Sequence, residues 1–363
     1  MSKARELAEL GAAYDGGALS NRNVIVNGAM QVAQRGTSFV GIGNAYSLDR
    51  FQWYAQNTGS GWTLSQSSVT DLAGFANALK VDCTTADTSL ASNEQGYVSY
   101  FAEGQDLQRF QKGHATALGF TLSFYVKTNK TGLYTVTMFD RDNTRKVNGS
   151  YTVADTNWNR YTISFPADTT GKFDDNNASS LEIFFNLFAG SDTNTGTLYT
   201  TWQASADAGS TTGQVNFADS TSNDWEITGV QLEVGSEATP FEHRSYADEL
   251  QRCQRYFHSV TVGADNTPVA VGAYYTATSV YATVFFPVTM RANPSLTSSN
   301  TSGHFHIFRN GNVDAIDGWS GLQSAGLSQT TFYISSGPNS TTGSACWVET
   351  NDAAAVTQFD AEL

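Results

Sequence analysis

Cysteine is scarce in this chain of 363 residues, with only Cys83, Cys253 and Cys346 present. Their number is odd and their spacing is wide, so they fit neither a disulfide framework nor a zinc-binding motif. A lone cysteine commonly fills a small apolar space in a core. We therefore expect three buried free thiols and a chain that folds in a reducing cytosol.

Charge is also sparse and mostly of one sign. Charged residues make up 15% of the chain and the net charge is −14, whereas an average soluble protein has about 25% charged residues. Nucleic acid needs a basic footprint on its partner, and an acidic chain lacks one. The balance argues against nucleic acid and, for the same reason, against anionic membranes.

Long hydrophobic runs and familiar catalytic signatures are missing as well. No run of 18 apolar residues occurs, so we expect no membrane insertion. The first residues, MSKARELAELGAAY, lack the apolar core of a signal peptide, so we expect no cleaved leader. The GxSxG, HExxH and P-loop motifs are also absent.

What the chain does have is alternation of apolar with polar or small residues. This period of two is typical of half-buried strands, and Asn-Gly, Lys-Thr-Gly and Asp-Asn turns separate the segments. Alternating segments lie at 120–126, 133–138, 161–165 and 225–228, and a continuous apolar run at 181–188 predicts a central strand. Many short strands at this spacing predict an antiparallel sandwich or jelly roll.

The stretch GVQLEVGSEATPFEHRSYADELQRCQRYF, residues 229–257, contains a strand, a corner and a short helix. Ser245, three residues before Asp248, resembles a capping box at the start of a helix. The helix would carry one apolar face. The residues of that face are Tyr246, Leu250, Cys253 and Phe257.

Together these patterns predict an all-β chain with two short helices. Residues 1–22 form an N-terminal helix that serves oligomerisation or attachment, with a frayed terminal helix as the alternative. Residues 23–243 form the antiparallel jelly-roll β-sandwich, 244–258 the connector helix, and 259–363 a smaller C-terminal β-domain.

Several stretches resemble the tail fibre and appendage proteins of marine tailed phages. The resemblance covers nearly the whole chain, and the segment after Gly229 is its most specific part. The stretches are VIVNGAMQVAQRGTS (24–38), YSLDRFQWY (46–54), residues 229–257, FPVTMRANPSL (286–296) and DAEL (360–363).

The resemblance implies a carbohydrate-binding-module-like jelly roll, closed by the strand VQLEV and followed by a C-terminal tip domain. It also implies a homotrimer in the virion, made in the host cytoplasm, that attaches to host-surface glycans beside other tail or capsid proteins. We take Leu7, Leu10, Tyr246 and Leu250 as predicted trimer contacts. Two alternatives stay open: a purely structural virion component without a receptor, and a polysaccharide depolymerase.

Sugar binding needs aromatic faces beside amide or carboxylate groups. Trp319 lies between Gly318 and Gly321, which predicts an exposed loop, and Asp317 is close by. Trp62 is the other predicted sugar-binding residue. Of the remaining tryptophans, we assign Trp158, Trp202 and Trp225 to the sandwich core.

His304 and His306 form the one pair with spacing suited to a metal. Residues i and i+2 of a strand share a face, so three copies of the pair could meet on a three-fold axis and bind a transition metal. The alternative is an ordinary surface pair, and we otherwise expect no cofactor.

Acidic pairs offer only weak support for catalysis. Asp140 and Asp142 resemble the opening of a calcium loop, but the later glycine and glutamate are missing, which favours a polar hairpin turn. Asp314 and Asp317 could be paired as glycosidase carboxylates, although such pairs arise by chance among 34 acidic residues. We expect a non-enzymatic protein.

Overall fold

The computed structural model describes residues 21–206, 208–261 and 263–363, and in this part the chain is almost entirely antiparallel β-structure. The chain forms two compact units, and the division falls between Glu249 and Leu250. Leu363 belongs with the first unit. Residues 1–20 of the predicted helical segment at 1–22, including Leu7 and Leu10, lie outside the described residues.

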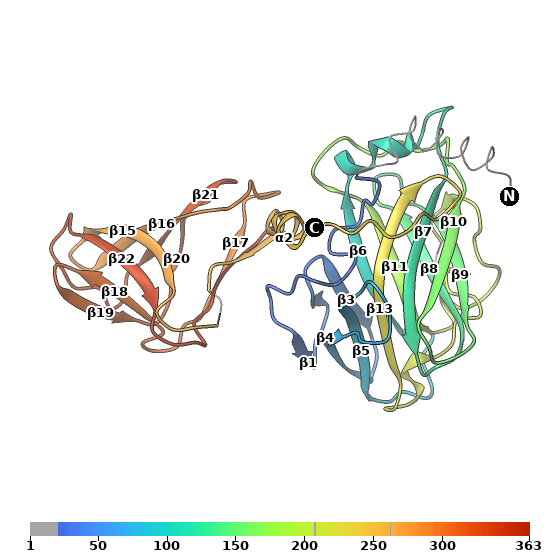
Figure 1. The fold of residues 1–363 in the computed structure, drawn as a ribbon, viewed down its shortest axis with the longest axis horizontal. Helices are drawn as coiled ribbons and strands as arrows, with labels where there is room; N and C mark the ends of the chain where they lie inside the picture. The colour runs from blue at the N-terminus through green and yellow to red at the C-terminus, as the bar shows by residue number, and fades with distance from the viewer. Residues whose placement is uncertain (1–20, 207, 262) are drawn as a thin grey trace. The chain divides into compact units, whose positions relative to one another are not determined.

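The first unit is a jelly-roll sandwich of two antiparallel sheets (Figure 1). One sheet has six strands in the order β1 (Ser38–Val40), β4 (Gly61–Ser68), β5 (Asn77–Thr85), β13 (Asp224–Val234), β7 (Phe120–Thr128) and β10 (Asn159–Phe165). The other has seven in the order β12 (Gln203–Ala204), β9 (Arg145–Val153), β8 (Gly132–Asp140), β11 (Ser179–Ala189), β6 (Gln95–Glu103), β3 (Phe51–Gln56) and β2 (Ala45–Tyr46). Two 3₁₀ helices, η1 (Gly104–Phe110) and η2 (Phe217–Asp219), lie in the connections.

The strand predicted to close the jelly roll, VQLEV, is the second half of β13. It is the last strand of this unit along the chain, yet it lies in the middle of its sheet, between β5 and β7. The predicted central strand at 181–188 is β11, which pairs with both β8 and β6. The central position of β11, which is paired on both sides, accounts for its largely apolar sequence.

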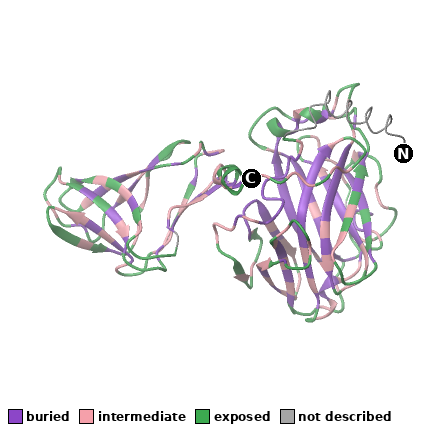
Figure 2. Ribbon diagram, in the orientation of Figure 1, coloured by how far each residue is buried: buried purple, intermediate pink, exposed green. Residues whose placement is uncertain are grey.

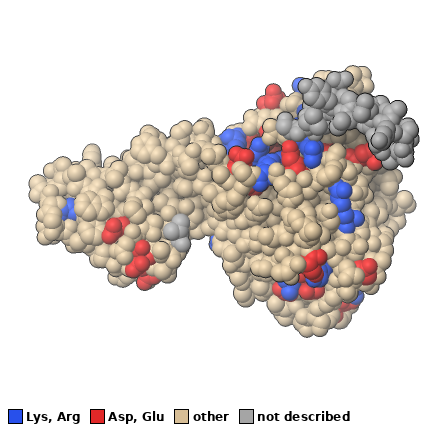
Figure 3. Space-filling model, in the orientation of Figure 1, with Lys and Arg blue, Asp and Glu red and all other residues tan. Residues whose placement is uncertain are grey.

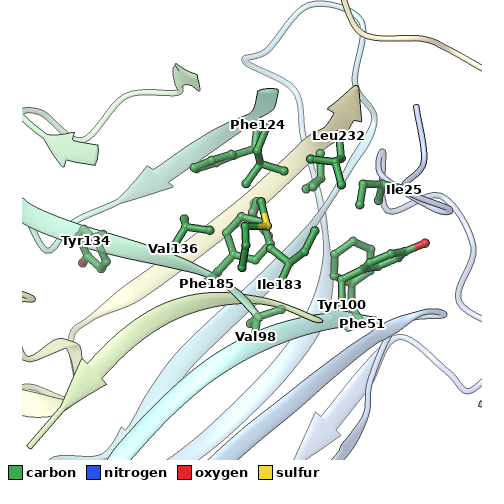
Figure 4. Close-up of a cluster of buried hydrophobic side chains, with 14 of the residues drawn as sticks. Ile25, Phe51, Val98, Tyr100, Phe124, Tyr134, Val136, Ile183, Phe185 and Leu232 are labelled. Atoms are coloured by element: carbon green, nitrogen blue, oxygen red, sulfur yellow. The ribbon is translucent and has the colours of Figure 1, made fainter. Parts of the chain in front are cut away.

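The core of the sandwich lies between the two sheets. Phe124 of β7 meets Phe185 of β11 edge to face, with ring centroids 5.2 Å apart. Figure 4 shows Phe124 and Leu232 facing Phe185, Ile183 and Val98, and Figure 2 shows that the buried segments follow the central strands. The apolar residues of the alternating pattern therefore form the inward face of each strand.

A buried ion cluster lies at one end of the sandwich. Asp140 ends β8 before the tight turn to β9, as the predicted polar hairpin requires, and its carboxylate accepts a hydrogen bond from the Nζ of Lys112. The same Nζ lies 3.1 Å from Asp168 and 2.7 Å from the carbonyl of Gly171. Arg145 also donates to Asp168 through two nitrogens, at 2.8 and 3.1 Å.

The hydrogen-bond donors of this cluster favour the charged form of Asp168. Burial alone would raise the pKa of Asp168, but hydrogen bonds from Arg145, the backbone of Thr170 and Lys112 hold that pKa below its ordinary value. The Lys112 and Asp140 side chains are 3% and 0% exposed. The ammonium group therefore joins β8 to the segment around 168–171 where no water can replace it.

The connector helix is α2 (Tyr246–Gln254). The Oγ of Ser245 accepts the backbone N–H of Asp248 at 3.2 Å, and its carbonyl accepts that of Glu249 at 3.0 Å. The predicted N-cap is confirmed.

The predicted apolar face of this helix is wrong at its first position. Tyr246 is 57% exposed, and Glu249 takes the inward place because its carboxylate accepts the backbone N–H of Asn27 and lies 3.5 Å from Arg244. Cys253 is fully buried as expected and Leu250 is partly buried. No helix in the described ranges combines the length and apolar character needed to cross a bilayer.

The second unit contains two further antiparallel sheets. A three-stranded sheet runs β14 (Phe257–Ser259), β23 (Thr357–Asp360), β17 (Ser295–Ser298). A seven-stranded sheet runs β19 (Asn312–Ile316), β18 (Phe305–Arg309), β22 (Ala345–Thr350), β15 (Pro268–Thr276), β16 (Ser279–Phe285), β21 (Gln329–Ile334) and β20 (Gly321–Ser324). Its core gathers Phe305, Phe332, Val348 and Phe359. The three cysteines are buried and form no disulfide, as predicted.

We predict that Lys112→Met strongly destabilises the first unit. Removing one partner of a buried ion cluster leaves carboxylates without compensation, which costs about 3–5 kcal/mol in the free energy of unfolding. Denaturant unfolding followed by tryptophan fluorescence measures the loss.

Lys127→Met is the matched control for this loss. Lys127 and Asp71 form an ion pair whose side chains are 34% and 54% exposed, so its loss should cost less than about 1 kcal/mol. Equal losses in the two variants would show that the buried cluster has no special part in stability.

Candidate functional site

The tryptophans predicted to bind sugar are buried. Trp62, on β4, is 3% exposed and stacks on Phe188 at 5.2 Å and on Phe217 at 5.9 Å. The period of two along β4 turns Trp62 and Leu64 into the sandwich. Trp62 therefore has no free face for a sugar ring.

Trp319 was expected on an exposed loop, and this expectation is wrong. It is 8% exposed, its Nε1 donates to Thr357 at 2.9 Å, and its ring meets Phe332. Gly318 makes this possible: a Cβ there would lie 1.8 Å from the carbonyl oxygen of Ser299, so only glycine lets the loop approach so closely. Asp317 stays exposed and accepts the N–H of Gly303 at 3.3 Å.

The other tryptophans follow their predicted places with one exception. Trp202 and Trp225 are buried in the core of the sandwich as expected. Trp158 is only partly buried, and its Nε1 donates to Asp71 at 2.9 Å. Of the five tryptophans considered from the sequence, only Trp158 has a partly exposed side chain.

One carboxylate of each acidic pair, Asp140 and Asp314, is paired with a cation. Asp314 receives two hydrogen bonds from Arg309, at 2.9 and 2.7 Å, and one from the hydroxyl of Tyr274. Asp140 belongs to the buried ion cluster. Neither carboxylate is placed as a free acid or base.

The histidine pair and the trimer contacts stay predictions. His304 is 9% exposed and His306 is partly exposed. Within the described part of a single chain, no group of at least three His, Cys, Asp or Glu side chains could hold a metal, whereas the proposed site needs three chains. Tyr246 is exposed and Leu250 partly buried.

The structure brings together a different set of residues on the outward face of the seven-stranded sheet of the first unit. Four aromatic rings follow one another across β3, β6, β11 and β8. Ring centroids are 4.8 Å apart from Tyr54 to Tyr97, 4.5 Å from Tyr97 to Phe184, and 6.4 Å from Phe184 to Phe139. All four residues are partly exposed. We call this row the aromatic stripe.

Strand periodicity explains why these rings point outward. Their sequence neighbours Trp53, Val98, Phe185 and Met138 are all fully buried in the core. Successive side chains of a strand point to opposite faces, so the stripe residues must lie on the other side of the sheet. The register then aligns them, because Tyr54 pairs with Tyr97.

Three rings of the stripe, those of Tyr97, Phe184 and Phe139, line a hollow of about 280 Å³ whose other lining residues are polar. Asn186, next to Phe184 on this face, donates to the hydroxyls of Thr135 and Thr137 at 3.1 and 3.2 Å. Gln95 donates to Gln56 at 3.0 Å. Amide and hydroxyl groups are thus held in fixed positions beside the rings. Further polar lining comes from Thr193, Ser205, Ser210 and Thr211.

One ion pair lies at the end of the stripe. Arg141 lies 2.6 Å from Glu182, and their side chains are 44% and 7% exposed. Burial raises the pKa of Glu182 to about 7, although the guanidinium of Arg141 pulls it the other way. Lys146, almost fully buried, also lines the hollow and donates to Ser210 at 3.0 Å. The hollow therefore combines rings, amides and the cationic side chains of Arg141 and Lys146, and Glu182 lies beside it as the partner of Arg141.

Sequence reasoning missed this site because its parts are far apart along the chain. Tyr97 and Phe184 are brought together only by the pairing of β6 with β11, in which Tyr97 faces Asn186. Within the apolar run 181–188, the signal was the polar pair Glu182 and Asn186 on the same parity as Phe184. That pattern marks an outward face inside an otherwise buried strand.

Comparison with known proteins gives only distant similarities. No protein-family model and no curated protein matches the chain. Among solved structures, it is similar to the enzymatically active domain of tailspike protein 4 of bacteriophage CBA120, with 11% identity and a TM-score of 0.31, over 59% of this chain and 22% of that one. The chain thus spans about a fifth of the tailspike.

Two other similar structures cover a similar share of the chain. One is a putative sugar binding protein from Bacteroides thetaiotaomicron, with 12% identity and a TM-score of 0.33, over 59% of this chain and 100% of that one. The other is a family 11 carbohydrate-binding module from Clostridium thermocellum, in complex with a β-1,3-1,4-mixed-linked tetrasaccharide, with 12% identity and a TM-score of 0.27, over 57% and 99%. We assign the chain to no family.

Replacing Glu182 with Gln should change how stability depends on pH. The ordinary pKa of this carboxyl is 4.5 and the folded value is about 7, so between these values the folded state keeps a proton that the unfolded state releases. The contribution of this group is full below about pH 4.5 and is lost as the pH rises through about 7. Glu182→Gln should flatten that fall, as measured by denaturant unfolding from pH 4 to pH 8.

Arg141→Gln provides the opposite change. Without the guanidinium, the charged form of Glu182 loses its main support, so the fall in the free energy of unfolding should extend to higher pH. Parallel curves for wild type and both variants would rule out Glu182 as the titrating group.

Proposed function

We propose that the first unit binds a glycan in the hollow above the aromatic stripe. The observation that carries this proposal is the row of four partly exposed rings beside amides already fixed by hydrogen bonds. With strands about 4.8 Å apart, four strands make a stripe roughly 14 Å long. Such a length suits a short run of sugar rings lying across the strands.

The mixture of groups favours a sugar over other ligands. A purely apolar ligand would cover Asn186, Gln95 and the neighbouring hydroxyls without pairing them, which is costly. A nucleic acid needs several free cations, whereas Arg141 is already paired with Glu182. Sugars offer apolar C–H faces to rings and hydroxyls to amides, so both kinds of group in the hollow gain a partner.

The proposed setting is a phage virion, in which the chain is a non-enzymatic appendage that attaches to host-surface glycans. The support for this setting is the resemblance of residues 24–38, 46–54, 229–257 and 286–296 to tail fibre proteins. A homotrimer would multiply a weak single contact through avidity. The proposed binding needs no cofactor.

Tyr97→Ala and Phe184→Ala should each weaken glycan binding about tenfold, because an aromatic contact contributes roughly 0.5–1.5 kcal/mol beyond its buried area. The measurement is binding of the labelled full chain to an array of purified bacterial surface polysaccharides, followed by titration of the best ligand. Both residues lie on the outward face, so the fold should survive.

Tyr125→Ala is the matched control for these variants. Tyr125 is also a partly exposed tyrosine on a central strand, but it lies on the other sheet, against Phe75 at 5.2 Å. Its loss should leave binding unchanged. An array without any bound glycan, or a bound glycan indifferent to Tyr97 and Phe184, would refute the proposal.

The proposed setting has its own test. Antibodies against the purified chain should label the tails of virus particles in immunogold electron microscopy, and the chain should appear in the mass spectrum of purified particles. Its absence from particles, with glycan binding intact, would separate the virion setting from the binding function.

A further inference from the structure

The seven-stranded sheet of the second unit has an unusually apolar outward face. Phe285 is 68% exposed, Val271 and Tyr275 are each 64% exposed, and Trp347 is 51% exposed. They lie on β16, β15 and β22, three adjacent strands. We call these residues, with Tyr281, the outer apolar face.

Periodicity and register place these side chains on one surface. Val280, Ala282 and Val284 on β16 are buried in the core of the unit, so Tyr281 and Phe285 point the other way. On β15 and β22, Val271 pairs directly with Trp347. Tyr275 stacks on Tyr281 with centroids 4.7 Å apart and planes 10° from parallel.

A hollow of about 500 Å³ adjoins this face. Its lining is mostly aliphatic and aromatic, with Pro268, Val269, Val284, Phe285 and Trp347 among the residues that form it. Aliphatic side chains such as Val271 do not stack on sugar rings, whereas they pack closely against other apolar side chains. The surface is therefore suited to a protein and poorly suited to a glycan.

Charge is sparse on the strands of this face. β15, β16 and β21 contain no Asp, Glu, Lys or Arg, and β22 has one charged residue, Glu349, which lies on the same side as Trp347 and is partly exposed. The sequence has no lysine after Lys172. On the side visible in Figure 3, the surface of residues 263–363 carries few charged atoms.

The exposed area is large enough to matter. With about 200 Å² of surface for each aromatic side chain, the exposed fractions of Phe285, Tyr275 and Trp347 amount to roughly 370 Å². A stable interface buries about 800 Å² on each partner. Three side chains thus supply nearly half of what a stable interface needs, before Val271, Tyr281 and the hollow are added.

We propose that the outer apolar face is covered by a second copy of this chain. The same surface presents projecting rings and an apolar hollow, so symmetry-related copies can each place rings in the hollow of the next copy, as a closed trimer requires. The face needs a partner with little charge and matching apolar groups, and another copy provides both. This interface lies in the second unit and does not depend on the glycan site of the first.

Sedimentation velocity of the full chain over a range of concentrations tests the interface. Wild type should sediment as an oligomer, and the double variant Phe285→Lys, Trp347→Lys should dissociate at concentrations at least tenfold higher. Val40→Lys, at a position in the first unit that is 81% exposed, is the control and should sediment as wild type. A monomeric wild type at every concentration would overturn the proposal.

Oxidative footprinting keeps the test decisive when other contacts also hold the oligomer together. In a single chain Trp347 is more exposed than the partly buried Trp158. In the oligomer Trp347 and Phe285 should become protected, so Trp158 should be oxidised faster. Rapid oxidation of Trp347 in the oligomer would show that the face is open to solvent. Glycan binding that is lost in the Lys variant and kept in Tyr97→Ala would assign the face to a sugar instead.

Discussion

The two-residue period of antiparallel strands, together with their register, determines which side chains lie on the aromatic stripe and on the outer apolar face. On β11 the period sends Ile183 and Phe185 into the core and leaves Glu182, Phe184 and Asn186 outward. A slip of one residue would exchange the two sets. The dense packing of rings such as Phe124 against Phe185 holds the register, so the core also fixes the geometry of the hollow.

Two buried carboxylates show how the same fold gives one chemical group opposite properties. Asp168 lies among Arg145, Lys112 and backbone donors, and these hold its pKa low despite burial. Glu182 has Arg141 as its main partner, and burial outweighs that partner and raises its pKa to about 7. The first arrangement stabilises one end of the sandwich. The second leaves a carboxyl beside the aromatic stripe that changes charge within the physiological range.

Local patterns predicted much of the fold. The alternation of apolar and polar residues predicted the strands and the all-β class. The apolar run at 181–188 predicted a central strand, and Ser245 predicted the start of α2. Each of these features depends on neighbours within a few residues. The positions of Trp62 and Trp319 were predicted wrongly for a different reason. Polar neighbours made Trp62 a candidate, but the period of two along β4 turns it inward. Flanking glycines suggested that Trp319 is exposed, whereas Gly318 serves a close approach to Ser299 that buries it.

The candidate site was beyond prediction because its residues share no local pattern. Phe139 and Phe184 are brought together only after β8 pairs with β11, and Tyr54 joins only through the pairing of β3 with β6. The alternation around each residue tells which side chains share a face, but not which strands will be neighbours. The alternation along a strand therefore predicts which aromatic side chains point outward. Only the order of the strands in the sheet decides which of these side chains form a stripe.

The two seven-stranded sheets show that outward aromatics alone do not define a function. Around Tyr97 and Phe184 the face carries amides, hydroxyls and the pair of Arg141 with Glu182, so a ligand must satisfy polar groups as well as cover rings. Around Phe285 and Trp347 the neighbours are mostly valines, together with Pro268. Removing this apolar surface from water is therefore favourable by itself. The polar residues between the rings, rather than the rings, distinguish the surface that we propose for a sugar from the surface that we propose for a second copy of the chain.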